Sequence, residues 1–291
     1  MKIGLMGIGL MGLPMAQRLI SANVSVVAYN RTTAKLAPLQ SQAECVSSPV
    51  DVLRDCDATI LMLSNAQAIR AVLFNESTHP LLAGNTIIQM GTIAPSESKS
   101  IQQEVIAAGG EYLEAPVLGS IPEAKDGRLL VMVGASSEQY QRWLPVLQKF
   151  GEAPLRVGEV GAAAALKLAL NQLIGSLAAA FGLSLSFLQT QGVEVETFMQ
   201  ILRQSALYAP TFDKKLQRML EENYANPNFP TKHLLKDTNL FLQEAIATQL
   251  GVESLTGVQK ILERACDRGL ADADYSALYA AIKPPAPEPI D

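Results

Sequence analysis

Hydrophobic positions along the chain follow two different patterns. In the first half, short apolar runs alternate with stretches in which apolar residues recur every three or four positions. Short strands that alternate with amphipathic helices predict βαβ units and a parallel sheet. Strands are expected at Lys2–Met6, Val24–Tyr29, Ala58–Leu63, Thr86–Gln89, Tyr112–Ala115 and Leu129–Val133, and helices at Met11–Ser21, Ala66–Phe74, Pro95–Ala108 and Glu138–Phe150.

The strand pattern ends near Val157, and helical periodicity fills the second half. Helices are expected at Ala162–Gln189, Val195–Ser205, Thr211–Asn223, Lys232–Gln249 and Val252–Arg268, separated by glycine and proline. We therefore predict an α/β fold with four parts. These are a parallel-sheet domain over 1–158, a long linking helix over 159–190, an all-α C-terminal domain over 191–284 and a loose tail over 285–291.

The long central helix has two interpretations. No charged residue occurs between Lys167 and Glu194, so the stretch is long enough to span a bilayer. Against this, Asn171, Gln172 and several serines interrupt it, and the flanking basic and aromatic residues are sparse. A helix that is apolar on most sides is also typical of the core of a larger protein. We expect a buried helix and no membrane association.

A glycine-rich segment lies between the first expected strand and the first expected helix. Its residues Gly7, Ile8, Gly9, Leu10, Met11 and Gly12 match the pattern GxGxxG. The first glycine permits a tight turn, the second lets backbone approach a pyrophosphate, and the third lets helix and strand pack closely. The free N–H groups of the helix N-terminus then face the anion. The segment predicts a Rossmann-type dinucleotide-binding domain.

The end of the second strand indicates which dinucleotide binds. NAD sites place an acidic residue there, about 20 residues past the glycines, to accept hydrogen bonds from the adenosine ribose. This chain instead has Asn30, Arg31 and Thr32. A guanidinium can pair with a 2′-phosphate through charge-assisted hydrogen bonds, so NADP(H) is favoured over NAD(H). The alternative is that Arg31 is a solvated surface residue and NAD binds regardless.

The composition of the chain limits the kinds of ligand and partner that it can bind. With 48% apolar and 18% charged residues the chain is a folded globular protein, and its net charge of −5 gives no broad basic face for nucleic acid. The cysteines, Cys45, Cys56 and Cys266, are odd in number and lack CxxC spacing, which argues against a disulfide framework and a zinc site. We expect a cytoplasmic protein with no bound metal.

Lys167 is the candidate for acid–base chemistry. It is the only charge in an Ala/Leu-rich stretch, and Asn171 follows four residues later on the same helix face. Burial would lower the lysine pKa towards neutrality, where it serves as both acid and base. On spacing alone, a lysine that reaches to the surface is an equal alternative. Of the two histidines, His79 falls in an expected loop and His233 in a helix, and neither is favoured.

Four motifs in order give the chain a resemblance to the β-hydroxyacid dehydrogenase family, which includes 3-hydroxyisobutyrate dehydrogenase and the glyoxylate/succinic semialdehyde reductases. The resemblance runs nearly end to end. Gly7–Ala16 resembles the family's cofactor signature and Glu114–Ser120 its substrate loop. Gly158–Asn171 resembles the start of its catalytic helix, and Phe229–Asp237 its Lys-Asp segment. Four ordered motifs are far more specific than any one of them.

The resemblance implies a role for each matching residue. Lys167 would protonate the alkoxide formed as NADPH delivers hydride, and Asn171 would orient it. Leu63, Ser64 and Thr92 would line the cofactor, and Lys236 would close over substrate and nicotinamide. Backbone around Leu118, Gly119 and Ser120 would hold the carboxylate of a small carbonyl or hydroxy substrate. A homodimer or homotetramer is also implied.

Two departures from the family pattern concern the substrate. Many members have serine at the position of Leu118, and leucine cannot donate a hydrogen bond to a carboxylate. Thr238 also stands where an apolar residue usually follows the Lys-Asp pair. The function that we predict is an NADPH-dependent reductase of small aldehyde- or keto-acids, reversibly a 3- or 4-hydroxyacid dehydrogenase. An imine reductase-like enzyme and a non-catalytic NADP-binding protein are the alternatives.

Overall fold

The computed structural model describes residues 1–283, and the tail expected over 285–291 lies outside them. Within it the chain divides into two compact units, Met1–Leu168 and Ala169–Asp291. The division falls inside the long helix α7 (Ala162–Thr190), so α7 belongs to both units. The sequence-based boundaries at 158 and 190 stay predictions.

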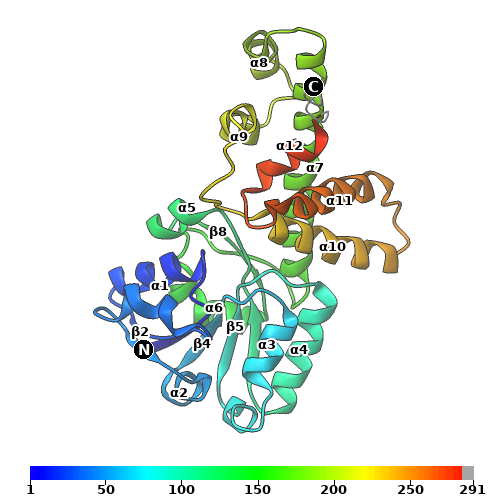
Figure 1. Cartoon of the computed structure of the whole chain (residues 1–291). Helices are drawn as coiled ribbons and strands as arrows, with labels where there is room; N and C mark the ends of the chain where they lie inside the picture. The colour runs from blue at the N-terminus through cyan, green and yellow to red at the C-terminus, as the bar shows by residue number, and fades with distance from the viewer. Residues whose placement is uncertain (284–291) are drawn as a thin grey trace. The chain divides into compact units, whose positions relative to one another are not determined.

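The first unit is built on one twisted sheet with helices on both faces (Figure 1). The strand order is β3-β2-β1-β4-β5-β6-β8-β7, with β9 paired to β8. The chain therefore leaves β1 in one direction through β2 and β3 and returns to its other side through β4. The strands are β1 (Lys2–Met6), β2 (Ser25–Tyr29), β3 (Glu44–Val46), β4 (Ala58–Leu61), β5 (Thr86–Gln89), β6 (Glu111–Glu114), β7 (Val117–Leu118), β8 (Leu130–Gly134) and β9 (Leu155–Gly158).

The predicted Rossmann-type domain is confirmed, but the sheet is not parallel throughout. Strands β3, β2, β1, β4, β5 and β6 pair in parallel, as expected from the alternating pattern. Strand β8 pairs antiparallel with β6 at Gly134 and with β7 at Val131. The connection from β7 to β8 through the short helix α5 (Ile121–Asp126) is too short for a parallel crossover, so β8 returns antiparallel.

The sequence pattern missed several short elements of this unit. Strand β3 and helix α2 (Pro49–Asp55) were absent from the expectation, because three strand residues and two helical turns carry little periodicity. Helix α2 nonetheless has a clear start, since the Ser48 side chain accepts the N–H of Val50 and Pro49 follows. The other helices on the sheet are α1 (Gly12–Ser21), α3 (Ala66–Leu73), α4 (Pro95–Ala107) and α6 (Ser137–Leu147).

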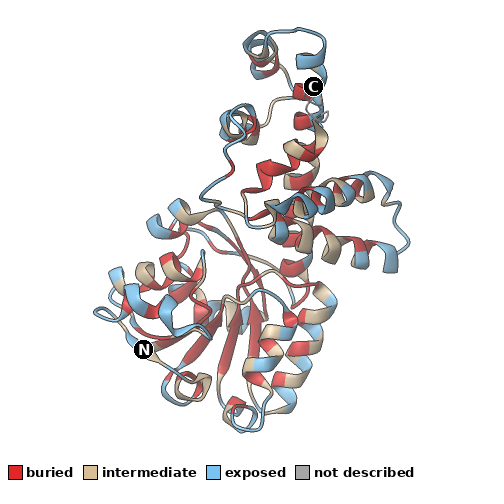
Figure 2. Ribbon diagram, viewed as in Figure 1, coloured by how far each residue is buried: buried red, intermediate tan, exposed pale blue. Residues whose placement is uncertain are grey.

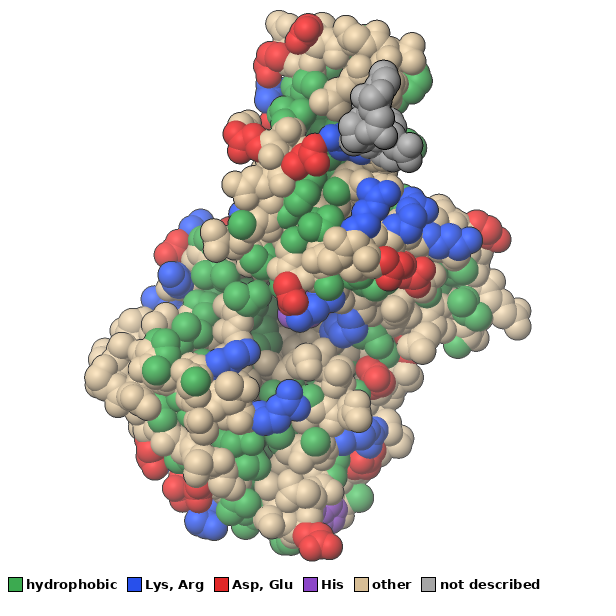
Figure 3. All heavy atoms as spheres, viewed as in Figure 1, with side chains coloured by type: hydrophobic (Ala, Val, Ile, Leu, Met, Phe, Trp, Pro, Cys, Tyr) green, Lys and Arg blue, Asp and Glu red, His purple; other side chains and the backbone are tan. Residues whose placement is uncertain are grey.

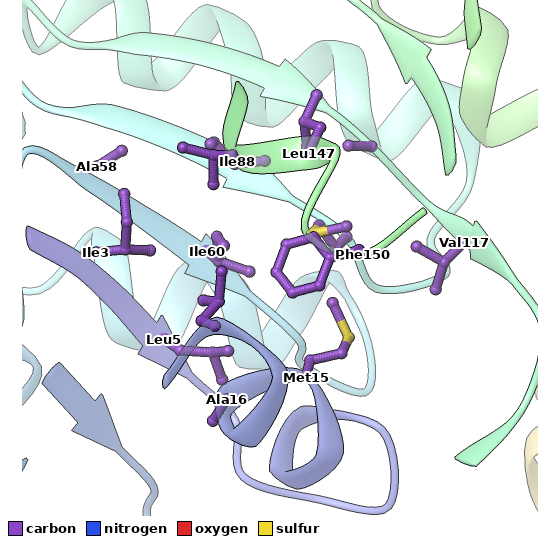
Figure 4. Close-up of a cluster of buried hydrophobic side chains, with 14 of the residues drawn as sticks. Ile3, Leu5, Met15, Ala16, Ala58, Ile60, Ile88, Val117, Leu147 and Phe150 are labelled. Carbon is purple, nitrogen blue, oxygen red and sulfur yellow. The ribbon is translucent and has the colours of Figure 1, made fainter. Parts of the chain in front are cut away.

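Alternating strand residues fill two hydrophobic cores, one on each face of the sheet. Ile3 and Leu5 of β1 point into the core that α1 and α6 cover, where Met15 and Leu147 meet them (Figure 4). Met6 belongs to the opposite core under α2, α3 and α4. Strands buried on both faces in this way (Figure 2) give the near-continuous apolar runs from which they were predicted.

The second unit is helical, as predicted. After α7 it contains α8 (Val195–Gln204), α9 (Pro210–Leu220), α10 (Thr231–Ala247), α11 (Glu253–Ala265) and α12 (Leu278–Ile282). One cluster gathers Leu234 and Leu262 with Ala178 of α7, and a second stacks Phe181 of α7 on Phe212 of α9, with ring centroids 4.6 Å apart. The helices thus pack around α7 and bury much of its apolar surface.

By length and composition, α7 is the one helix among residues 1–283 that could cross a membrane. In the structure, 44% of its most apolar window is buried. It also carries a buried polar side chain, Asn171, whose partner is a residue of α10. The expectation of a buried helix without membrane association stays a prediction. On the face shown in Figure 3, basic side chains are interspersed with acidic ones and do not form one broad field.

A buried ion pair fastens α9 to the segment before α12. The Lys215 ammonium lies 2.8 and 2.9 Å from the two carboxylate oxygens of Asp274, which is fully buried. It also lies 4.3 Å from the ring centroid of Tyr275, and Ser276 donates to the same carboxylate. Burial lowers the pKa of Lys215, and the carboxylate opposes that effect.

Replacement of Asp274 by alanine should therefore lower the free energy of unfolding by about 3–5 kcal/mol, because it leaves the Lys215 ammonium buried without a counter-charge. Urea unfolding followed by the helical circular dichroism signal measures this change. The matched control is Asp272→Ala, which removes an exposed pair with Lys232 and should leave the free energy of unfolding nearly unchanged. Equal losses in the two variants would contradict the assignment.

Candidate active site

The glycine loop after β1 is fixed by close backbone contacts. Gly7 has φ +106°, and a Cβ there would lie 2.3 Å from the carbonyl oxygen of Met62. A Cβ on Gly12 would lie 1.9 Å from the Gly7 carbonyl oxygen, so α1 packs against the loop only without a side chain. Nothing lies within 4 Å of the Cβ position of Gly9. The first and third glycines thus serve the fold, while the second leaves open space where a ligand can approach the backbone.

Asn30 ties the glycine loop to the end of β2. Its Oδ1 accepts the N–H of Ile8 at 2.9 Å, and its Nδ2 donates to the carbonyl of Thr32 at 2.9 Å. The Ile8 amide is therefore engaged within the protein, which makes Asn30 a support for the loop. Arg31 and Thr32 are exposed, as is Lys35, whose amide bonds to the Thr32 carbonyl. Sequence reasoning missed Lys35, although a second cation four residues after Arg31 was visible.

The segments after β4 and β5 lie next to each other beside the glycine loop. A Cβ on Gly91 would lie 2.5 Å from the carbonyl oxygen of Leu63. The Gln89 side chain spans this turn, donating to the Gly91 carbonyl at 2.9 Å and accepting its amide at 3.1 Å. Half-buried Leu63, exposed Ser64 and half-buried Thr92 stand on these segments. They follow β4, which is adjacent to β1, and β5, the next strand, at the edge where open α/β sheets bind ligands.

The segment after β6 presents an unusual set of donors. Gly119 is exposed with φ +138°, a conformation that only glycine adopts readily, and Leu118 is half-buried. The amide of Ser120 donates to the Glu123 carboxylate at 2.9 Å and is therefore already used. The hydroxyl of Ser120 is buried without a hydrogen-bond partner in the structure. The hydroxyl is thus a polar group whose hydrogen bonding a ligand could complete.

Lys167 stands in the second turn of α7 with only 8% of its surface exposed. It is the only charged residue of that helix. The first turn of α7 is held by the buried carboxylate of Glu114, which accepts backbone N–H groups from Gly161 and Ala163 at 2.8 Å each. The sequence identifies Glu114 only as the first residue of the motif Glu114–Ser120 and does not predict its hydrogen bonds to the start of α7.

The second unit brings Asn171 together with the Lys-Asp pair of α10. The Asn171 amide nitrogen donates to Asp237 Oδ2 at 2.7 Å, and both side chains are at least 97% buried. Lys236 places its ammonium 2.8 Å from Asp237 Oδ1. An ionised carboxylate only accepts, so it fixes the amide orientation and turns Asn171 Oδ1 away from itself. That oxygen is buried without a hydrogen-bond partner in the structure.

His233 precedes Lys236 by one turn of α10 and is half-buried. Burial lowers its pKa, and the neighbouring charges of Lys236 and Lys232 lower it further, against the opposing effect of Asp237. A neutral imidazole is the expected form at pH 7.

Among residues 1–283, no group of three or more His, Cys, Asp and Glu side chains could hold a metal ion.

Two family models cover the described chain almost completely. Residues 2–163 match the NAD binding domain of 6-phosphogluconate dehydrogenase. Residues 161–282 match the NAD-binding domain of NADP-dependent 3-hydroxyisobutyrate dehydrogenase. The two models therefore meet at the start of α7, the helix that carries Lys167.

Among curated proteins, the chain is similar to two reductases of Arabidopsis thaliana. It is 32% identical to the chloroplastic glyoxylate/succinic semialdehyde reductase 2, over 97% of this chain and 79% of that protein. It is 30% identical to glyoxylate/succinic semialdehyde reductase 1, over 97% and 99%. It is also 29% identical to human cytokine-like nuclear factor N-PAC, over 96% of this chain and 51% of that longer protein.

Solved structures share the fold over nearly the whole chain. The 3-hydroxyisobutyrate dehydrogenase of Mycobacterium tuberculosis has a TM-score of 0.87 at 19% identity and covers 97% of this chain and 99% of its own. The Salmonella typhimurium 3-hydroxyisobutyrate dehydrogenase has a TM-score of 0.85 at 22% identity, over 96% and 99%. An imine reductase from Myxococcus stipitatus follows at 0.66 and 18% identity, over 97% and 100%.

The glycine loop at the centre of the sheet, the helix that carries Lys167 and the two matching family models lead to the same assignment. The chain belongs to the 3-hydroxyisobutyrate dehydrogenase family, the NAD(P)-binding oxidoreductases that act on CH–OH and C=O groups and include the glyoxylate/succinic semialdehyde reductases.

Proposed function

We propose that the protein is an NADPH-dependent reductase of small aldehyde- or keto-acids, and that it runs in reverse as a 3- or 4-hydroxyacid dehydrogenase. One observation carries the proposal. The only charged residue of α7, Lys167, is buried one helical turn before Asn171. A buried lysine one turn from a buried amide suits a group that gives a proton to a substrate oxygen and takes it back.

The residues of the first unit fit a dinucleotide. The open space at Gly9 lets backbone approach a pyrophosphate, and the N-terminus of α1 follows directly. Exposed Arg31 and Lys35 would pair with a 2′-phosphate, and Thr32 would bind the ribose beside them. Leu63, Ser64 and Thr92 would line the nicotinamide half. When bound, NADPH would supply the hydride for the carbonyl carbon.

Lys167 would complete the reduction by giving its proton to the carbonyl oxygen, and would take that proton back in the reverse direction. Asn171 would help from the next turn of α7. Because Asp237 holds its amide nitrogen, the group that Asn171 presents is an acceptor oxygen. An acceptor orients an ammonium or a hydroxyl, so Asn171 would hold the Lys167 ammonium or the substrate hydroxyl in position.

The substrate carboxylate would bind at Leu118, Gly119 and Ser120, with Lys236 as a further cation. The Ser120 amide is occupied by Glu123, so its hydroxyl and the Gly119 backbone are the donors we propose. Two relatives named as glyoxylate/succinic semialdehyde reductases support this class of substrate. A carboxylate fixed at one end would hold the carbonyl in a reactive geometry.

An imine reductase on the same fold is the second candidate. Leu118 removes a hydroxyl donor from the carboxylate segment, and an imine reductase shares the fold. A buried lysine with an acceptor one turn away suits a carbonyl oxygen better, which favours the first proposal. NADPH-dependent turnover of glyoxylate and succinic semialdehyde, compared with a cyclic imine, separates the two.

We also propose a homodimer or homotetramer in the cytoplasm. Leu183 and Phe187 stand four residues apart on one face of α7 with 62% and 61% of their surfaces exposed. Large exposed apolar side chains in a row are typical of an interface with another chain. The three cysteines are free thiols, which fits a reducing compartment.

Lys167→Ala should lower kcat by about 10²–10⁴-fold, because the proton donor to the carbonyl oxygen is lost. The dissociation constant for NADPH, measured by fluorescence titration, should stay unchanged. Lys260→Ala, which removes an exposed lysine of α11, is the control and should leave kcat at the wild-type value. An unchanged kcat in Lys167→Ala would reject the proposed chemistry.

Arg31→Asp should lower the ratio of kcat/KM for NADPH to that for NADH by about ten- to hundredfold, since it removes a charge-assisted partner of the 2′-phosphate and adds a repelling charge. Steady-state kinetics with both cofactors measure the ratio. Arg54→Ala, an exposed arginine paired with Asp51 on α2, is the control and should leave the ratio unchanged. A wild-type ratio in Arg31→Asp would remove this residue from the phosphate site.

The double variant Leu183→Glu, Phe187→Glu should weaken self-association by roughly 30-fold or more, because each carboxylate would be buried at the interface. Light scattering across a dilution series reports the mass. Ile201→Glu, which changes an equally exposed residue of α8, should keep the wild-type mass. A double variant with unaltered mass, or a monomeric wild type, would overturn the proposed assembly.

A further inference from the structure

Glu114, at the end of β6, is the most heavily hydrogen-bonded carboxylate of the first unit. Its side chain is 1% exposed. Oε1 accepts the backbone N–H groups of Gly161, Ala163 and Ala164 at 2.8, 2.8 and 3.1 Å. Oε2 accepts the hydroxyl of Ser98 at 2.5 Å. The carboxylate therefore joins α4, β6 and the first turn of α7.

These partners suit an ionised carboxylate. Burial raises the pKa of Glu114, while the hydrogen bonds from Ser98 and the three amides act in the opposite direction. Each of these groups can donate to the charged form, and the hydroxyl of buried Tyr112, 2.9 Å from Ser98 Oγ, can extend the chain of donors. A negative charge at a helix N-terminus is also favoured by the helix dipole.

Two positions next to this carboxylate are glycine, and each depends on the absence of a side chain. A Cβ on Gly134 of β8 would lie 2.4 Å from Glu114 Oε1, so any larger residue there would displace the acid. Gly161 has φ +102°, which lets the chain turn sharply so that its amide and those of the first helical turn all face one oxygen. Two glycines distant in sequence thus serve one contact.

We propose that Glu114 is a positioning residue for the reaction, in addition to a cap for α7. This inference rests on the proposed function of Lys167. Lys167 follows Ala163 by four residues and Ala164 by three, so it lies on the same face of α7, one turn beyond the amides that Glu114 holds. Because the first two turns of a helix are stiff, the carboxylate fixes the position of Lys167 along the axis of α7. It also fixes the rotation of Lys167 about that axis.

The same residue also sets the start of the segment proposed to hold the substrate carboxylate. The chain runs from Glu114 through β7 to Leu118, Gly119 and Ser120 within six residues. One side chain therefore fixes the positions of both the proton donor and the proposed substrate-binding segment relative to the end of β6. A displacement of either by about 1 Å costs up to about 100-fold in rate when reacting atoms must be aligned.

The test compares Glu114→Ala with Glu114→Gln by kcat, by the dissociation constant for NADPH and by amide exchange. Glu114→Ala should lower kcat by about ten- to hundredfold while the dissociation constant for NADPH changes less than about twofold. Glu114→Gln should restore most of kcat, because its carbonyl oxygen can still accept the three α7 amides. Hydrogen exchange of the Gly161, Ala163 and Ala164 amides should accelerate in the alanine variant and stay slow in the glutamine variant.

Ser136→Ala is the matched control. It removes the side-chain cap of α6, where Ser136 Oγ accepts the Gln139 amide at 3.1 Å, and should leave kcat unchanged. If Glu114→Ala does not fold, Ser98→Ala replaces it. That variant removes one hydrogen bond from the carboxylate, and kcat should fall about threefold or more with faster exchange of the same amides.

A wild-type kcat alongside faster exchange of the three amides, in Glu114→Ala or in its replacement, would overturn the positioning role and leave Glu114 as a cap alone. Unchanged exchange would overturn the anchor itself. Neither outcome touches the proposed function, which Lys167→Ala tests separately. The failure of one is therefore distinguishable from the failure of the other.

Discussion

The attachment of α7 to the sheet through a buried carboxylate is the contact on which the proposed arrangement of the functional side chains depends. The amide of Gly161 and two amides of the first helical turn donate to Glu114, and Lys167 follows in the second turn. An apolar helix has few polar groups that define its rotation about its own axis. A charged hydrogen-bonded contact at its start provides that definition, because it is directional where hydrophobic packing is not.

Buried polar groups serve two different ends in this protein. The Lys215 ammonium donates to the Asp274 carboxylate, which also accepts the Ser276 hydroxyl, and the Tyr275 ring lies next to the ammonium. The pair therefore has a structural role. Asn171 and Asp237 are buried as deeply, yet one oxygen of Asn171 has no hydrogen-bond partner in the structure. Burying an unpaired polar atom costs free energy, and under the proposed function a bound substrate would complete its hydrogen bonding.

The sequence predicts the elements whose signal is local and repeated. The glycine loop, the long strands and helices and the isolated Lys167 all follow from periodicity or from a single short motif. The strand β8 is predicted, but its antiparallel direction is not, because strand pairing decides it. The short β3 escapes prediction because three residues carry little periodicity. The role of Glu114 also escapes prediction, since its partners lie 47 to 50 residues further on. The sequence shows which residue types are present, but it does not show which distant segments come into contact.

The arrangement of donors after β6 bears on which substrates the proposed site can select. Leu118 offers no side-chain donor, and the Ser120 amide is spent on Glu123, which leaves one hydroxyl and the Gly119 backbone near the proposed carboxylate position. A site with few fixed donors discriminates weakly between substrates that differ by one methylene, because at most one buried donor, the Ser120 hydroxyl, is left unpaired when the fit changes. On this basis, selectivity would come more from the position of Lys167 relative to the anchor than from the anchor itself. The number of carbon atoms between the carboxylate and the carbonyl of the substrate would then decide which substrates react.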